Sequence, residues 1–218
     1  MKTLMILLYV VIAGSLLAIS SFYFAEPFYH KMVAEDGLFE NITALGLLMI
    51  SILSLLRLIR QRGERNKYWM FLNVLIVLGA FFGFGEEISW GQRIFSIQAG
   101  DYFMQNNLQG ETNLHNLEIG GVNINKLIFS RGLVIVFGAY FFLSLILYRK
   151  WNGFKKLVDL FGVPLPRIQY SVMLLVCTLP ILLVPDRRIW ELWEAIFVTI
   201  LLLVFIDPWN EKEGLLKK

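Results

Sequence analysis

Two adjacent glutamates and one histidine are the residues of this sequence best suited to do chemistry. Glu86 and Glu87 directly follow the aromatic stretch 81–85, and His115 lies in the polar stretch after them. A carboxylate at the C-terminus of a helix opposes the helix dipole, and one in mid-helix here would lie among aromatic rings. Either position needs a compensating cation, metal or proton. The sequence therefore predicts that these three residues are catalytic, through general acid–base chemistry or a metal.

Further carboxylates could complete the same site. Glu191 and Glu194 are three residues apart and share a helix face, and Glu40 lies at the outer end of a short apolar stretch. An alternative for these three is structural, because carboxylates near helix N-termini favour the dipole and cap free amides. Carboxylates with one imidazole suit zinc, manganese or iron. The ligands predicted for such a divalent metal are Glu40, Glu86, Glu87, Glu111, His115, Glu191 and Glu194.

Cationic and amide side chains flank the predicted site. On a helix that continues through the glutamate pair, Glu86, Trp90 and Arg93 would share one face. Two more arginines directly precede the last apolar stretch. Arginine binds anionic head groups through charge-assisted hydrogen bonds, although a loop arginine can also serve only to solvate its loop. The predicted substrate-binding residues are Gln92, Arg93, Arg187 and Arg188.

The chain as a whole has the composition of a membrane protein. Of its 218 residues, 57% are hydrophobic and 17% are charged, whereas soluble domains have about 45–50% and about 25%. These values exclude a disordered chain, a coiled coil and a nucleic-acid-binding module. The single cysteine, Cys177, excludes a disulfide framework. The net charge of +3 is interpreted as a signal of membrane orientation, and no nucleic-acid partner is expected.

Six stretches are apolar and long enough, or nearly so, to cross a membrane as helices of about 20 residues. The sequence predicts an all-α, polytopic bundle of six transmembrane helices that forms a single domain over residues 1–218. The connection 88–130 is too long for an idle loop, and we expect it to fold partly into the bundle on the outer face. The predicted spans cover about residues 4–24, 39–57, 68–87, 130–148, 168–185 and 189–207.

The distribution of charge predicts how the bundle is oriented. With the N-terminus in the cytoplasm, 14 of the 20 lysines and arginines fall on the inner side, in line with the positive-inside rule. Both termini are therefore predicted to be cytoplasmic. Twelve of the 17 carboxylates and both histidines fall on the outer side. We therefore expect a site that faces the periplasmic side of a bacterial inner membrane, with membrane lipid as its partner.

Two acidic stretches resemble the motifs of a known family. Glu26-Pro-Phe-Tyr29 followed by Glu40-Asn-Ile-Thr43 is similar to the first-helix acidic motif of alkaline ceramidases and related multi-span membrane hydrolases. Glu191-Leu-Trp-Glu194 is similar in placement to the last-helix histidine pair of that family. The resemblance implies a lipid hydrolase with a cation site near Glu26 and Glu40. The family's zinc histidines are missing, its seventh span is missing and its motif spacing differs, so the zinc site is not carried over.

The sequence favours an enzyme of the outer leaflet, namely a metal-dependent hydrolase or transferase that acts on a lipid or lipid-linked substrate. Two alternatives stay open. A small transporter or proton-coupled permease could use the carboxylates as a relay, although carriers usually bind near the membrane midplane. A structural or assembly subunit of a membrane complex could use its polar outer cap to bind a protein partner, whose identity the sequence leaves unknown.

Overall fold

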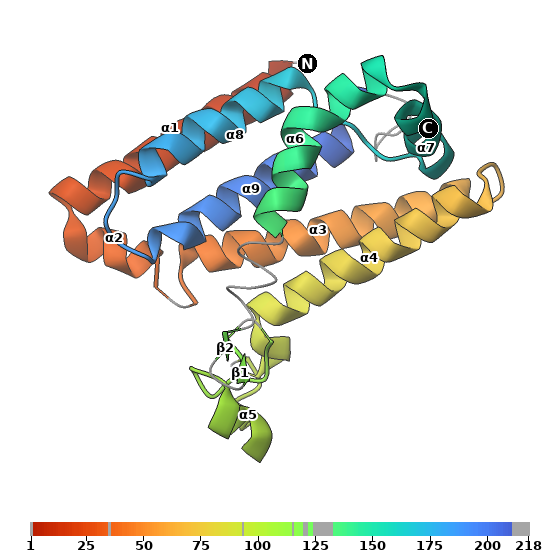
Figure 1. Ribbon diagram of the computed structural model, residues 1–218. Coiled ribbons are helices and arrows are strands. Elements are labelled where there is room, and N and C mark those ends of the chain that lie inside the picture. The colour runs from red at the N-terminus through yellow and green to blue at the C-terminus, as the bar shows by residue number, and fades with distance from the viewer. Residues whose placement is uncertain are drawn as a thin grey trace.

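Helices form most of the structure (Figure 1). The computed structural model describes residues 2–34, 36–92, 94–114, 116–119, 122–123 and 133–210. Within these residues the all-α prediction is confirmed, with one small hairpin in which Glu118 of β1 pairs with Asn123 of β2. The elements are α1 (Lys2–Phe24), α2 (Glu26–Met32), α3 (Leu38–Gln61), α4 (Lys67–Glu87), η1 (Ser89–Gly91), α5 (Asp101–Asn106), β1 (Glu118–Ile119), β2 (Val122–Asn123), α6 (Leu133–Lys150), α7 (Asn152–Phe161), α8 (Ile168–Ile181) and α9 (Ile189–Ile206).

A helix lies within each of the six predicted spans, but fewer than six qualify as spans among the described residues. The helices α3, α4 and α9 are long and apolar enough to cross a membrane. The chain bends by 114° between α6 and α7, and these two helices count as a fourth span only if the bent pair is taken as one. The helix α8 ends at Ile181, directly after Pro180, and is shorter. These helices indicate an integral membrane protein, and the number six stays a prediction.

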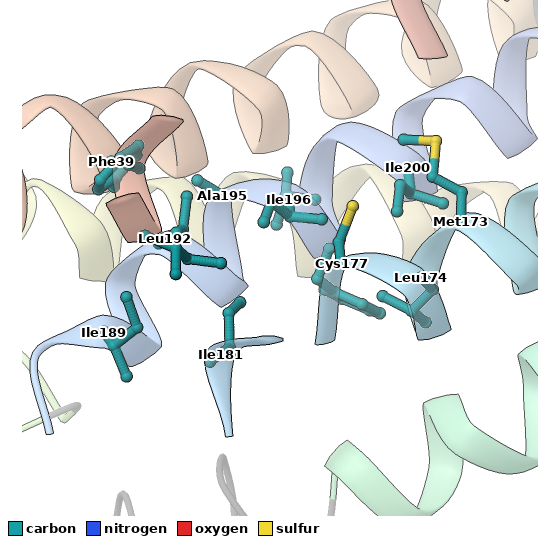
Figure 2. Packing of buried hydrophobic residues seen from close by; sticks show 14 of the residues in the cluster. Phe39, Met173, Leu174, Cys177, Ile181, Ile189, Leu192, Ala195, Ile196 and Ile200 are labelled. Carbon is teal, nitrogen blue, oxygen red and sulfur yellow. The ribbon is translucent and has the colours of Figure 1, made fainter. Parts of the chain in front are cut away.

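The helix α9 lies at the centre of the bundle. It packs against α3 and α8, and its buried side chains form one apolar cluster with those of α8. Figure 2 shows Leu192, Ile196 and Ile200 of α9 close to Cys177 and Ile181 of α8. This cluster positions the first two turns of α9, which carry the predicted site residues Glu191 and Glu194.

The two ends of the bundle differ in charge. At one end, which we call the acidic end, α3 begins, α4 ends and α9 begins (Figure 1). The described part of the connection 88–130 lies beyond the end of α4 (Figure 1), where the backbone N–H of Leu114 donates a hydrogen bond to Glu86. The expectation that this connection folds partly into the bundle stays a prediction. At the opposite end, which we call the basic end, α4 begins beside α7. The side chain of Asn66 caps α4 there by accepting hydrogen bonds from the backbone N–H groups of Tyr68 and Trp69, both at 2.9 Å.

We expect the close packing of α3 on α9 to depend on Gly46. A Cβ atom at this position would lie 2.6 Å from Cγ1 of Val198, whereas one at Gly138 in α6 would meet nothing within 4 Å. Gly46→Ala should therefore lower the free energy of unfolding by about 1–3 kcal/mol. Gly138→Ala should leave it unchanged or raise it by up to about 1 kcal/mol. Thermal unfolding in detergent measures both, and equal stability of the two variants would contradict the expectation.

Candidate functional site

A polar cavity of about 380 Å³ lies at the acidic end, where the three helix ends meet. Its walls come from the start of α3, the end of α4, the first turn of α9 and the amide-rich stretch 109–116. Four of its lining side chains are carboxylates and three are amides, while Arg188 adds a positive charge. These carboxylates and amides are Glu40, Glu86, Glu87, Glu191, Gln109, Asn113 and Asn116.

The structure brings together acids that lie far apart in the sequence. Glu40 comes from α3, Glu86 and Glu87 from α4, and Glu191 from α9. Glu194, one turn further along α9, is also close enough to repel the charge of Glu87. The carboxyls of Glu40, Glu86 and Glu191 also face Glu87. These five residues form the acidic cluster, and their catalytic and metal-binding roles stay predictions.

Within this cluster the carboxyl of Glu86 is held by hydrogen bonds on both oxygens. Its Oε1 accepts from Nε1 of Trp90 at 2.8 Å, and its Oε2 accepts from the backbone N–H of Leu114 at 2.6 Å. The residue is 5% exposed. These bonds join the end of α4 to the stretch 109–116. A carboxylate that is bonded in this way is suited to hold the site together.

Glu87 and Glu194 have a different environment. Neither accepts a hydrogen bond from any of the residues that the structure describes. Both residues are half-buried, and each lines a cavity. Glu87 lines the polar cavity directly. Of the two adjacent glutamates, Glu86 is therefore the one that is bonded on both oxygens, and a catalytic role for Glu87 stays a prediction.

An apolar cavity of about 590 Å³ lies on the other side of the same glutamates. It is bounded by α3, α4, α6 and α9, mostly with aliphatic and aromatic side chains such as Leu47, Ile76 and Phe137. Glu86 and Glu87 line this cavity as well as the polar one, and Glu194 lines it from α9. The acidic cluster therefore stands at the boundary between a polar space and an apolar space.

The helix α4 ends at Glu87 and the chain then reverses sharply, so of the two alternatives for the glutamate pair the structure has the one at the C-terminus of a helix. Ser89, Trp90 and Gly91 all have positive φ, at 47°, 53° and 79°. Glycine adopts this region without strain, whereas side-chain hydrogen bonds hold Ser89, which is buried, and Trp90, which is exposed. The Oγ of Ser89 donates to Oε2 of Glu111 at 2.6 Å, and the turn still brings the Trp90 ring to Glu86.

Glu111 belongs to a buried hydrogen-bond network that fixes the outer connection. The Nδ2 of Asn113 donates to Oγ of Ser89 and to Oε2 of Glu111, both at 2.9 Å. Asn107 in turn donates to Oδ1 of Asn113 at 2.9 Å. Glu111 lines neither cavity. Sequence reasoning missed Ser89, Asn107 and Asn113, for which the high amide content of this stretch is the available signal.

The four predicted substrate-binding residues do not lie together in one cavity of the described structure. Arg188 lines the polar cavity, whereas Arg187 is exposed and lines neither cavity. The Oε1 of Gln92 accepts a hydrogen bond from the backbone N–H of Thr112 at 2.7 Å, which is a structural contact. Arg93 lies outside the described residues.

The metal prediction is not settled by the described residues. Among them no group of three or more carboxylate, histidine or cysteine side chains is arranged to hold an ion. His115, the predicted imidazole ligand, lies outside that part of the chain. The divalent metal and its ligands therefore stay a prediction.

The structural alternative applies in part to Glu40. The backbone N–H of Asp36 donates to its carboxyl at the start of α3, which resembles a capping arrangement. Glu40 nevertheless lines the polar cavity. Glu26 does not line it, and its Oε1 lies 3.4 Å from Nε2 of His30 instead. Glu26 and Glu40 therefore do not share the polar cavity, as a cation site near both residues would require.

No family model, curated protein or solved structure matches the chain. The resemblance to alkaline ceramidases therefore rests only on the acidic stretches themselves and stays a prediction.

We expect the network around Asn113 to hold the amide-rich stretch against α4. Asn113→Ala removes the amide that donates to the buried oxygens of Ser89 and Glu111. The free energy of unfolding should therefore fall by about 1–3 kcal/mol. Amide hydrogen exchange should quicken in the stretch 94–114 and stay slow in α9. Asn106→Ala serves as the control, because the bond that this side chain donates within the described part of the chain is an exposed one, to the Tyr102 carbonyl. Equal protection in both variants would show that the network does not fix this stretch.

Proposed function

We propose that this protein is a membrane-embedded enzyme that acts on a lipid or lipid-linked substrate, as a hydrolase or a transferase. The observation that carries this proposal is that Glu86 and Glu87 line both a polar and an apolar cavity. An amphiphile is the kind of molecule that fills both spaces at once. Its polar head would lie among the carboxylates and amides, and its chain would lie between α4, α6 and α9.

The dimensions of the two cavities support this assignment. Ligand sites usually measure about 300–1,000 Å³, and the volumes of about 380 and about 590 Å³ fall in that range. The apolar cavity is bounded on one side by α6, which makes few contacts with α3 or α4. A lipid chain can therefore reach it from the bilayer more easily than a water-soluble substrate can.

The chemistry assigned to the site is proton transfer. In this proposal Glu87 accepts the proton of an attacking water or hydroxyl group while the new bond to carbonyl carbon or phosphorus forms. A second carboxyl of the cluster, Glu194, returns a proton to the leaving oxygen as the ester bond breaks. Glu86 positions the site through its bonds to Trp90 and Leu114, and Arg188 orients the head group.

The position of the acids favours this enzyme over a permease. All five members of the acidic cluster lie at or within two turns of the ends of their helices. Carriers bind near the membrane midplane, with acids distributed in depth. An acidic cluster at one interface suits a substrate that stays in one leaflet, and the charge distribution of the sequence assigns that leaflet to the outer side.

Glu87→Gln should abolish turnover and leave lipid binding in place. The variant keeps the size of the side chain but cannot accept a proton, so we expect a fall in rate of about 100-fold or more. The protein is reconstituted with the polar lipid extract of its expression host, and time-dependent lipid products are measured by mass spectrometry. Glu64→Gln removes one charge from the exposed loop at the basic end and should keep the rate. Unchanged turnover in Glu87→Gln would refute the assigned role.

Filling the apolar cavity should prevent binding itself. Gly79 lines this cavity, and an added Cβ there meets nothing within 4 Å, so Gly79→Leu should fold and displace a lipid chain. Lipid retained after purification, measured by native mass spectrometry, should fall several-fold. Gly14→Leu is the matched control, because Gly14 has the same open surroundings and lines neither cavity. Equal retention in both variants would argue against a chain in this space.

A further inference from the structure

The basic end carries a short amphipathic helix that the proposed site does not use. This helix, α7, meets α6 at 114° and stops at Gly162, whose φ of 64° ends it in a left-handed turn. Its last turn is fixed to the start of α4. The Nδ2 of Asn66 donates to the carbonyl of Leu160 at 3.0 Å, and the rings of Tyr68 and Phe161 lie 5.6 Å apart.

These contacts define the depth of α7 in a membrane. The helix α4 is one of the candidate spans, so its first residues lie where the chain passes from water into lipid. A helix that is fixed to those residues and turned by 114° from α6 cannot continue across the bilayer. It runs along the surface instead, as interfacial amphipathic helices do.

Part of the apolar surface of α7 is left uncovered by protein. Val158 is buried and packs with Leu145 and Leu165 in a small cluster of its own. By contrast, Leu157 is 53% exposed, and Trp151 at the start of the helix is 59% exposed. Tryptophan and leucine side chains of this kind lie at the boundary between head groups and acyl chains.

The opposite face of α7 is basic, and so are the parts of the chain around this helix. Lys155 and Lys156 are exposed on it, and Asp159 accepts a hydrogen bond from the Tyr148 hydroxyl at 2.8 Å. Further cations at this end are exposed on the neighbouring helix ends and loop, and the exposed acids that accompany them in the described part of the chain are Glu64 and Asp159. These cations are Arg60, Arg62, Lys67, Arg149 and Lys150.

We propose that α7 is a binding surface for anionic lipid, with Leu157 and Trp151 in the outer part of the acyl layer and Lys155 and Lys156 on the head groups. Lysine stems can cover apolar surface while their ammonium groups reach the head groups. Each lysine close to an anionic surface strengthens the attraction. The inference does not depend on the proposed enzyme, because it concerns the other end of the bundle.

The first experiment tests recognition of charge. Wild-type protein and Lys155→Gln/Lys156→Gln are reconstituted with phosphatidylcholine and phosphatidylglycerol, and the ratio of the two lipids retained is measured by native mass spectrometry. We expect the double variant to retain at least about fivefold less phosphatidylglycerol relative to phosphatidylcholine. Lys31→Gln removes one charge at the acidic end, where Lys31 is exposed, and should keep the wild-type ratio, whereas the single variant Lys156→Gln should already lower it. An equal loss in Lys31→Gln and Lys156→Gln, or no loss in the double variant, overturns the proposal.

The second experiment tests the depth of the helix. A nitroxide label is attached to Leu157→Cys or to Lys156→Cys, while the native Cys177 is 2% exposed and out of reach of the reagent. The label at position 157 should be more accessible to oxygen than to a water-soluble nickel chelate, and the label at position 156 should show the reverse. Equal access of the chelate to both labels would place α7 in water and overturn the proposal.

Discussion

Repulsion between carboxyls is the constraint on which the acidic end depends. The charge of Glu87 is opposed by four other carboxyls from three helices, and such a gathering is costly at membrane depth. The helices are nevertheless held together, because the buried face of α9 packs against α3 and α8 along much of its length. Apolar packing in the middle of the bundle thus offsets electrostatic repulsion at its end, and the cluster stays in place for a ligand, cation or proton to compensate.

The polar connection after α4 gives this end its rigidity. Three consecutive residues with positive φ reverse the chain, and the buried bonds among Ser89, Glu111 and Asn113 hold the reversal. Glu86 is bonded by the same segment. Two neighbouring glutamates therefore have different environments, one bonded on both oxygens and the other open to the cavities. The turn causes this difference. Glu86 is held in place and positions the site, whereas the proposed chemistry is assigned to Glu87.

The two ends of the bundle suit different parts of a membrane. The acidic end has a polar cavity next to an apolar cavity, which suits one amphiphile taken up from the bilayer. The basic end has an exposed amphipathic helix and exposed cations, which suit a charged lipid surface. A protein that is fixed at one surface in this way would keep its acidic cavity at a constant depth under the other surface.

The sequence by itself determined the class of the protein and the location of its helices. Apolar stretches interrupted by charges predict membrane helices, because burial in lipid requires uncharged runs of about 20 residues. The same reasoning identified Glu87, Glu191 and Glu194 as acids near helix ends. It left open whether the helix continues past Glu87, because the left-handed turn that begins at Ser89 is stabilised by Glu111, which lies 22 residues away. Only the tertiary structure decided which acids share a cavity, since the approach of α3, α4 and α9 depends on packing contacts such as that of Gly46 on Val198, and residue spacing along one chain does not encode them.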